Sequence, residues 1–578
     1  MNDLPPLDSG ADGIEEGKRL IRQGGDGGLS LSERIAERFH RLTWRTPIHT
    51  LKLKGRHPLK LLTVADDPFF GDVERGQALL DGELAFRGEA LPVGMLGLDR
   101  PTFSKAYGEH LHAFAWLRDL SSVTTRAVGA PIAEAIMRQW IAAHGAMISE
   151  PAWRPDLWGR RILYWTAHAP LILSSTDLVY RSNVLHALAR GARHLDRTAD
   201  KAPAGAPRIA AWCGVVAAGL MIPGGDPRRV FGEAGLAKAM AASLTEDGGI
   251  VGRSPASLYD AIQLVTMLRG TYAARRMDLP EAVAERLPKM VSALLGVSHA
   301  DKALSSWQGG CPQDPELIVQ TIEATGVRTR PLRQAREWGY QRMSAGNTLI
   351  IVDAAPPPVA RMVDGGCAST LAFEFSDGAS RIVVNCGGAR SAVAQVPAAL
   401  AEGLRTTAAH STLVLGDSNS TALHADGTLG KGVAEVELSR QESDATSRIE
   451  ASHNGYVRRF GLVHRRLLAL GNDGRDLRGE DMLLPEGRRR RRDAVPFAIR
   501  FHLAPDVEVA PTSDGQAAFL RLPGQLLWQF RAKGAALTIE ESLWINAFGR
   551  PIATRQLVLT GEAPPGGASI SWAFHRSR

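Results

Sequence analysis

The sequence predicts a two-domain protein, an incomplete (α/α) toroid followed by an antiparallel β-sandwich. Apolar residues recur at helical spacing between residues 103 and 300, and they alternate with period two beyond residue 340. The chain has 578 residues, more than one hydrophobic core usually organises. We therefore expect a disordered N-terminal tail over 1–30, a toroid domain with a short irregular lead-in over 31–325, and a sandwich over 340–578.

The first residues are rich in Gly, Asp and Pro, a composition typical of disorder. They lack the basic start and apolar stretch of a secretory signal. Residues 31–39 then predict a short amphipathic helix, since Leu31, Ile35 and Phe39 share one face. Between about 45 and 100 the pattern is irregular.

Eight helices joined by short links are expected next. Several begin with Pro or a capping residue and end near Gly, Asp or His. The expected helices span 103–120, 131–144, 155–173, 178–196, 207–220, 231–244, 255–276 and 280–297. They share no repeat of fixed length, so a regular solenoid is not indicated. Antiparallel pairs curling into an incomplete toroid fit this pattern, and a helical bundle is the alternative.

The period-two region predicts many short strands with Gly and Asp turns, which is typical of a β-sandwich. Its clearest strand is 497–503, where Phe497, Ile499, Phe501 and Leu503 fall on one face. The domain boundary is expected between 310 and 345.

Composition excludes several classes of function. Apolar runs are too short to cross a bilayer, so we expect no stable membrane insertion. The four Cys have neither paired nor metal-ligand spacing, and we expect no metal site. The net charge is +7, much of it from the run Arg488–Arg492, which we interpret as a solvated loop or a lure for an anionic polymer. Aromatic residues do not interleave with this run, so nucleic-acid binding is disfavoured.

One segment carries most of the functional information. In Arg405-Thr-Thr-Ala-Ala-His410-Ser411-Thr-Leu-Val414 a histidine stands at the mouth of a strand, where a base can reach a bound polymer while the sheet fixes its backbone. This segment resembles the active-site histidine motif of the heparinase II/III-like polysaccharide lyases, with Ser411 where Asn is usual. Other matches, each weak alone but in the same order, lie at 43–47, 112–120, 247–255, 371–374 and 500–503.

The resemblance implies a function. Lyases of this family cleave acidic polysaccharides by β-elimination, which needs a donor for the uronate carboxylate, a base for the C5 proton and an acid for the departing oxygen. No metal or organic cofactor is required. The expected partner is an acidic polysaccharide. Family members usually work in the cell envelope or periplasm, and a cytoplasmic location is the alternative because no signal is visible.

The resemblance also implies a set of site residues. Asn183, His186 and Arg190 share one face of a helix similar to the family helix that neutralises the carboxylate. Asn183 would do this with assistance from the other two, and the alternative is a face that meets solvent. Arg253, in an Asp-Gly-Gly…Arg-Ser-Pro turn, could bind a carboxylate bidentately.

The tyrosine that family members carry two residues after this Pro is Ser257 here. Tyr259 lies two positions further and points elsewhere on a helix. Tyr456 occupies a family position on the sandwich and would replace it as the acid, or would anchor a turn. We interpret His464 and His502 as structural.

We therefore predict a polysaccharide lyase with His410, Tyr456, Asn183 and Arg253 as catalytic residues. His186, Arg190, Arg405 and Tyr259 would bind substrate. The alternative is a protein that kept the lyase fold and binds an acidic glycan without cleaving it; Ser257 favours this reading and the His410 segment disfavours it. The sequence leaves the polymer and the oligomeric state open.

Overall fold

The computed structural model describes most of the chain. Its described ranges are residues 14–22, 47–98, 102–358, 365–389, 396–424, 427–486 and 493–577. The expected helix at 31–39, the motif at 43–46 and the run Arg488–Arg492 lie outside these ranges.

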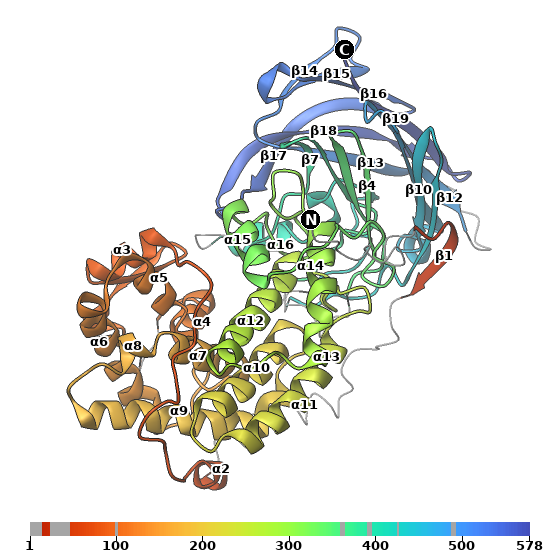
Figure 1. The fold of residues 1–578 in the computed structure, drawn as a ribbon. Helices are drawn as coiled ribbons and strands as arrows, with labels where there is room; N and C mark the ends of the chain where they lie inside the picture. Colours follow the sequence, from red (N-terminus) through yellow and green to blue (C-terminus); the bar gives the residue numbers. More distant parts are fainter. Residues whose placement is uncertain are drawn as a thin grey trace, which may run out of the picture.

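The first domain is mainly helical, and neighbouring helices run antiparallel to one another (Figure 1). Its elements are α2 (Pro47–Lys52), α3 (Val73–Leu80), the hairpin β2 (Glu83–Phe86) and β3 (Glu89–Pro92), α4 (Lys105–Ala113), α5 (Trp116–Val123), α6 (Arg126–His144), α7 (Pro155–Ala167), α8 (Ala169–Ile172), α9 (Leu178–Thr198), α10 (Ala206–Met221), α11 (Asp226–Ser243), α12 (Pro255–Ala274), α13 (Glu281–Ala284), α14 (Arg286–Gly296) and α15 (Pro315–Thr325).

The expected helix over 103–120 is in fact two helices. Phe114 breaks it because this residue adopts a left-handed conformation, with φ of 64°. Its ring is buried against Trp116, Trp140 and Trp165, at centroid distances of 5.3, 5.7 and 5.2 Å. Burial of an aromatic side chain outweighs the cost of one unfavourable backbone conformation.

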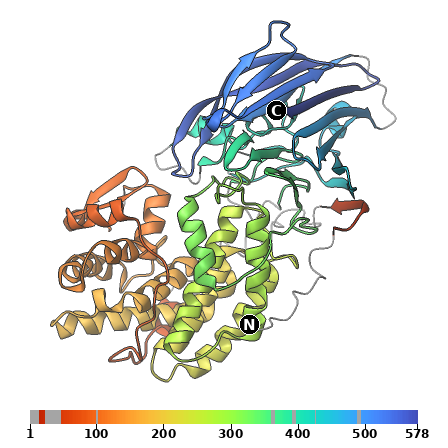
Figure 2. The same cartoon turned by 45° about the horizontal axis from the view of Figure 1, so that its top comes forward.

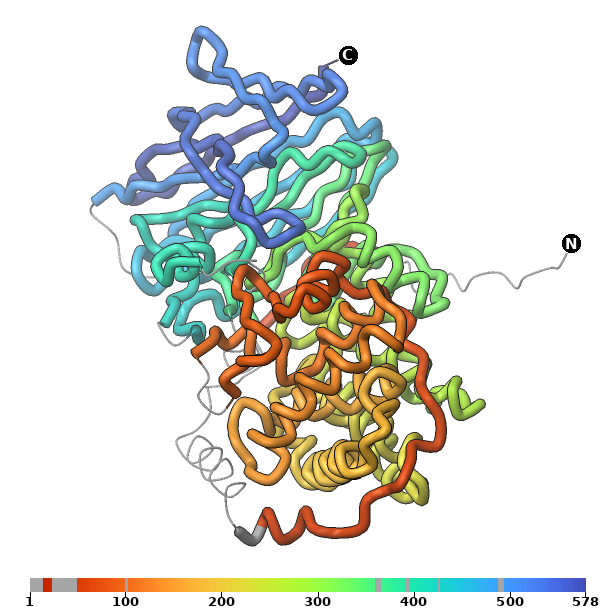
Figure 3. Tube along the Cα trace, turned by 90° about the vertical axis from the view of Figure 1, so that its left-hand side faces the viewer, coloured from red at the N-terminus to blue at the C-terminus, as the bar shows by residue number. Residues whose placement is uncertain are grey.

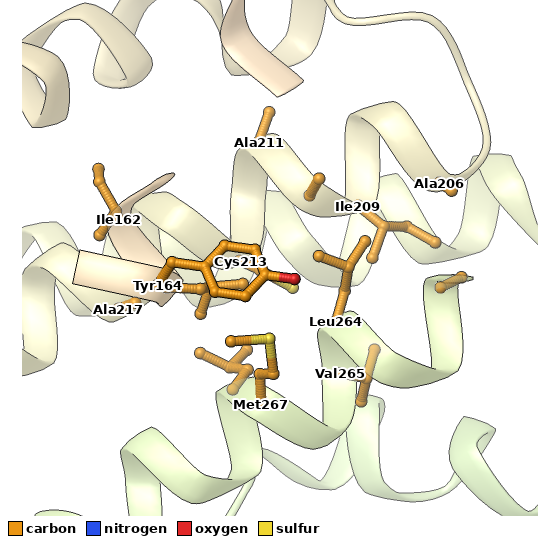
Figure 4. Close-up of a cluster of buried hydrophobic side chains, with 14 of the residues drawn as sticks. Ile162, Tyr164, Ala206, Ile209, Ala211, Cys213, Ala217, Leu264, Val265 and Met267 are labelled. Carbon is orange, nitrogen blue, oxygen red and sulfur yellow. The ribbon is translucent and has the colours of Figure 1, made fainter. Parts of the chain in front are cut away.

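Helix α10 is the centre of this domain. It is apolar almost all round, and it packs against α7, α9, α11 and α12. Figure 4 shows Ile209 and Cys213 of α10 beside Tyr164 of α7 and beside Leu264 and Met267 of α12.

The second domain is a sandwich of two antiparallel sheets. One sheet has the order β1-β9-β10-β11-β12-β19-β16-β15-β14, and the other β17-β18-β13-β7-β6-β5-β4 with β8 beside β13. The strands are β1 (Gly17–Arg22), β4 (Tyr340–Ala345), β5 (Thr348–Asp353), β6 (Phe373–Asp377), β7 (Ser380–Val384), β8 (Leu413–Leu415), β9 (Glu435–Glu442), β10 (Thr446–His453), β11 (Leu462–Gly471), β12 (Asp476–Pro485), β13 (Val495–Leu503), β14 (Glu508–Pro511), β15 (Ala517–Arg521), β16 (Leu527–Lys533), β17 (Ala536–Ile545), β18 (Pro551–Ala563) and β19 (Ala568–Arg576).

Period-two alternation predicts the buried faces well. Phe497, Ile499, Phe501 and Leu503 of β13 are all in the core between the sheets. The predicted fold class, a helical toroid domain followed by an antiparallel sandwich, is confirmed.

The two domains meet at one end of the helical domain. Figure 2 shows the sandwich seated on the ends of the helices that include α12, α14 and α15, while α9 lies at the opposite end (Figure 1). The segment that follows α2 runs along the outside of the helical domain toward the sandwich (Figure 3). Its backbone is fixed on the way, because Leu62 donates to Met221 O and Ala65 to Thr166 O.

Part of the expected disordered tail has a regular structure. Gly17–Arg22 forms β1, which pairs with β9 at the edge of the larger sheet. Sequence composition misses this strand because its partner lies more than 400 residues away. None of the helices in the described ranges combines the length and apolar composition that a membrane crossing requires.

Candidate active site

His410 follows the short 3-10 turn Thr407–Ala409 and precedes β8. Its Nδ1 lies 2.7 Å from Thr406 O. Since a carbonyl only accepts hydrogen bonds, Nδ1 carries the proton and Nε2 of the neutral ring is left as an acceptor. The side chain is only 2% exposed. Burial lowers the pKa of His410, against the opposing effects of the Thr406 hydrogen bond and of the nearby charges of Asp353 and Glu374.

Ser411 fixes the segment between two strands. Its Oγ donates to Val384 O at 2.7 Å and accepts from the His502 amide at 3.0 Å. Its own amide donates to Asn385 Oδ1 at 3.0 Å. Ser411 therefore joins β7 to β13. His502 adds a second anchor, since its Nε2 donates to Ala408 O at 2.9 Å.

Glu374 is the centre of a buried network between the domains. It accepts from His299 Nε2 at 3.1 Å, from the Ser306 amide at 2.8 Å and from Asn385 Nδ2 at 3.1 Å. Arg381 lies 3.3 Å from the same carboxylate. Burial opposes ionisation of Glu374, but the hydrogen bond from His299 and the charge of Arg381 outweigh it and lower the pKa.

Arg253 ties the helical domain to β5. It adopts a left-handed conformation, with φ of 55°, and its side chain is buried. The guanidinium bonds to Asp353 Oδ1 at 2.6 Å and to Trp338 O at 2.8 Å. It also donates to Ala355 O and Pro356 O, at 3.2 and 2.8 Å. These partners use the donors that the sequence assigned to a substrate carboxylate, so Arg253 serves as a clamp between the domains.

The two tyrosines are also engaged. Tyr456 is buried, and its hydroxyl donates to Leu413 O at 2.8 Å, three residues after His410. Burial raises its pKa well above the ordinary range for tyrosine. Tyr259 joins α12 to α15, donating to Leu317 O at 3.2 Å and accepting from Thr321 Oγ1 at 3.1 Å. Burial raises the pKa of Tyr259 to about 12. Tyr456 and Tyr259 are thus placed as anchors.

Arg405 clamps neighbouring loops. Its guanidinium donates to Gly366 O at 3.0 Å, to His424 O at 3.2 Å, and to Gly427 O and Thr428 O at 2.7 and 3.2 Å. Four N–H groups therefore hold backbone carbonyls, and the predicted substrate-binding role would need this clamp to open.

The residues predicted on α9 lie elsewhere. Asn183 is exposed on the outer surface of the helix. His186 is half-buried and packs edge-on against His57, with ring centroids 5.1 Å apart. Arg190 is buried; it donates to Gly145 O and Ala146 O and lies over Trp153. Asn183 therefore meets solvent and Arg190 is held by backbone carbonyls of the helical domain, while the role of this face in holding a carboxylate stays a prediction.

Basic residues lie along α9 and the segment 52–57 that packs on it, on a surface that we call the α9 face. Arg193 binds the neighbouring segment to α9 by donating to Leu53 O at 2.9 Å and to Arg56 O. His57 lies 3.1 Å from Ser182 Oγ. The one acidic residue of this stretch of α9, Asp196, is paired with Arg228. The α9 face comprises Lys52, Lys54, Arg56, His57, Ser182, Asn183, His186, Arg193 and Arg197.

The structure therefore divides the predicted residues into two groups. In the first group, Arg253 bonds across the domain boundary to Asp353, His410 lies near Asp353 and Glu374, and Arg405 and Tyr456 are held within the sandwich domain. The second group is on α9, at the far end of the helical domain (Figures 1 and 2). The sequence analysis gave no site role to Glu374 or Asn385, which lie near His410. Glu374 belongs to the stretch 371–374 that resembles the family, and Asn385 directly follows β7. We call His299, Arg253, Asp353, Glu374, Arg381, Asn385, His410 and Ser411 the junction network.

Within the described parts of the chain, His, Cys, Asp and Glu side chains do not gather in groups of three that could hold a metal ion. His453, His464 and Asp481 form a chain of hydrogen bonds, with distances of 3.2 Å between the two imidazoles and 2.7 Å from His464 to the carboxylate. His464 is structural in this chain.

Comparison with known proteins agrees with the fold. Residues 327–573 match the family model "Heparinase II/III-like, C-terminal". FtsZ-localized protein C of Caulobacter vibrioides is 29% identical over 563 residues, which cover 92% of each chain. The crystal structure of heparinase III superposes with a TM-score of 0.68 at 12% identity, covering 96% of this chain and 93% of that one. Heparan sulfate lyase HepC of Pedobacter heparinus gives 0.58 at 15% identity, covering 91% and 87%.

These matches confirm the resemblance that the His410 segment indicated. The family model matches the C-terminal domain, and the solved structures match the fold of nearly the whole chain. The C-terminal part of the chain matches the heparinase II/III-like family, and the whole chain has the fold of heparinase III.

Proposed function

We propose that this protein binds an acidic glycan on the lyase fold without cleaving it. One observation carries the proposal: the groups that β-elimination needs do not meet on one sugar. The base must lie within hydrogen-bonding reach of C5 while a donor neutralises the adjacent carboxylate and an acid approaches O4. Here the predicted amide, Asn183, belongs to α9, which lies at the far end of the helical domain from the sandwich that carries His410 (Figure 1). The hydroxyl of Tyr456 and the guanidinium of Arg253 hold backbone carbonyls and Asp353.

The α9 face is the proposed binding surface. Lys52, Lys54 and Arg56 are exposed on a segment that has no acidic residue between Pro47 and Ala65. Asn183 and Ser182 add exposed amide and hydroxyl groups beside them. Fixed cations with neighbouring polar groups suit the carboxylates and hydroxyls of an acidic polysaccharide.

The packing of this surface supports a preformed site. Gly55 lies directly against the Arg193 guanidinium, where an added Cβ would come within 2.9 Å of Nη2. Together with the bonds from Arg193 to Leu53 O and Arg56 O, this holds the cationic segment on α9. A surface that is already ordered loses less conformational entropy on binding.

The name of the relative from Caulobacter supports a localised binding protein, since it describes a place within the cell and not a reaction. We extend this to the present chain as part of the proposal. The cell envelope, where acidic glycans are found, remains the proposed location.

Binding is tested with heparin as the acidic polymer and dextran as the neutral control. The variant Lys54→Ala/Arg56→Ala should lower affinity for heparin about tenfold at low salt, and added salt should reduce the difference. The matched control removes two exposed cations from the sandwich, Arg531→Ala/Lys533→Ala. Equal losses in both variants would show non-specific attraction and reject the α9 face.

Elimination remains a second candidate. The neutral ring of His410 carries its proton on Nδ1, so Nε2 can accept a proton as a catalytic base must. A panel of acidic polysaccharides can be assayed for the ultraviolet absorbance of an unsaturated uronate product. We expect no product with the native chain. Product that disappears in His410→Ala would replace the binding proposal with a lyase.

A further inference from the structure

The larger sheet is completed by a strand that comes from the start of the chain. All six residues of β1 pair with β9, from Gly17 opposite Arg440 to Arg22 opposite Glu435. The pairing is antiparallel, so β1 covers the backbone hydrogen-bonding groups that β9 would otherwise present at the sheet edge.

Side-chain packing contributes little to this attachment. None of the residues 14–22 is buried, and Leu20 is 44% exposed. Ile21 alone reaches the margin of the sandwich core. On the other side of β9, by contrast, β10 buries Ile449 and Ala451. The strand β1 is therefore held mainly by main-chain hydrogen bonds, which an equivalent extended peptide could supply equally well.

Charge supplies the selectivity. The strand β1 carries Lys18, Arg19 and Arg22, whereas β9 carries Glu435, Glu437 and Glu442 and one cation, Arg440, which is buried and paired with Glu442. Arg22 pairs with Glu435 at 3.2 Å. Opposite charges on paired strands favour one another, so the β9 edge suits a basic segment over an acidic one.

The residues before β1 form a second, polar contact. The Glu15 amide donates to Gln334 Oε1 at 2.8 Å, and its carboxylate lies 3.4 Å from Arg336. Both partners belong to the connector between the domains. Residues 14–19 thus form one wall of a groove of about 800 Å³ whose other wall includes Lys289, Arg333 and Glu337.

We infer that the edge of β9 is a docking site for an extended peptide that combines basic and apolar residues, and that residues 17–22 occupy it as an internal competitor. The partner is a polypeptide segment that adds to the sheet as β1 does. Because the competitor is tethered to the same chain, it must be released before the edge accepts another segment, and this lowers the apparent affinity for the partner.

The test uses a fluorescein-labelled synthetic peptide that covers Ile14–Arg22 and two forms of the protein, the full chain and a chain that begins at residue 23. Fluorescence anisotropy should show at least about tenfold tighter binding to the shortened chain, because the competitor is gone. A peptide in which Lys18, Arg19 and Arg22 are replaced by Glu should not bind. The same Glu-substituted peptide should bind a shortened chain that carries Glu435→Lys/Glu437→Lys, because the charges are then opposite again.

A full-length variant guards against effects of the deletion on folding. Lys18→Glu/Arg19→Glu/Arg22→Glu should open the edge and admit the native peptide, while circular dichroism and the melting temperature show an intact fold. Equal affinity of the peptide for the native chain and for the opened chains would contradict the proposal that residues 17–22 act as an internal competitor. Absence of binding to either opened chain, with the fold intact, would overturn the docking site.

Discussion

The junction network and the α9 face both hold polar residues that the sequence assigned to one site, yet they differ in what surrounds them. At the junction, carboxylates, guanidiniums and imidazoles are buried and bonded to one another across the domain boundary. On the α9 face, Lys54, Arg56 and Asn183 are exposed.

This difference separates structural from binding roles. A buried charge is stable only when its partners remain in place, so the junction residues are constrained by the cost of leaving any of them unpaired. Exposed cations keep their hydration until a ligand replaces it, and they can be changed with little effect on folding. Four substitutions or conditions test the contrast, from the largest expected effect on stability to the smallest.

Glu374→Ala should destabilise the protein by about 3–5 kcal/mol, because it leaves the Ser306 N–H and the side-chain amide of Asn385 buried without their acceptor and removes one of the two carboxylates that pair with Arg381. Denaturant unfolding measures the loss. Glu508→Ala, which breaks an exposed pair with Arg521, serves as the control and should leave the unfolding midpoint unchanged. A loss of less than about 1 kcal/mol in Glu374→Ala would show that the junction network contributes little to the stability of the fold.

Lowering the pH from 7 to 5 should destabilise the folded protein through its buried histidines. Burial lowers the pKa of His502 to about 3 and that of His194 to about 3, below the value of about 6.5 in the unfolded chain. The unfolded chain therefore binds protons first as the pH falls, and each such histidine costs about 2 kcal/mol of stability over this range. Depressed carboxylates such as Asp67, with a pKa of about 2, contribute only at lower pH.

The histidine prediction is checked by comparing unfolding free energies at pH 7 and pH 5 in the native chain and in His502→Gln. The variant should be less stable at pH 7 but should lose about 2 kcal/mol less on acidification. An unchanged pH dependence would mean that His502 is not neutral in the fold.

Tyr456→Phe should cost about 1–2 kcal/mol, because Leu413 O loses its donor inside the sandwich. Tyr107→Phe is a matched control in the helical domain, where the hydroxyl donates to Leu84 O at 2.8 Å. Thermal unfolding should show losses of similar size. If only Tyr107→Phe destabilised the chain, the Tyr456 hydroxyl would be available for chemistry and the lyase would regain support.

Asn183→Asp should leave stability within about 0.5 kcal/mol of the native value, since the side chain is exposed. It should weaken heparin binding about threefold by placing a negative charge among the cations of the α9 face. Isothermal titration with Asn183→Ser as the neutral control separates charge from loss of the amide. Unchanged affinity in Asn183→Asp would exclude this part of the surface from the binding site.

Sequence patterns predicted the architecture because periodicity reports directly which residues are buried. They identified the sandwich strand at 497–503 and the order of the two domains. They missed β1, whose register depends on a distant strand, and the break at Phe114, which depends on three tryptophans from other turns and helices.

The site was harder to predict than the fold. Helical spacing predicted that Asn183, His186 and Arg190 share one side of α9, but it could not show that the guanidinium of Arg190 binds Gly145 O. The spacing around Arg253 likewise could not reveal that Asp353, one hundred residues later, pairs with it.

By itself the sequence determined the fold class and the histidine segment, because both depend on neighbours along the chain. Only the tertiary structure decided which polar side chains are exposed and which have their hydrogen bonds satisfied by other domains. Exposure and hydrogen bonding depend on which groups come within reach and which lose their contact with water, and both are set when segments far apart in the chain pack together.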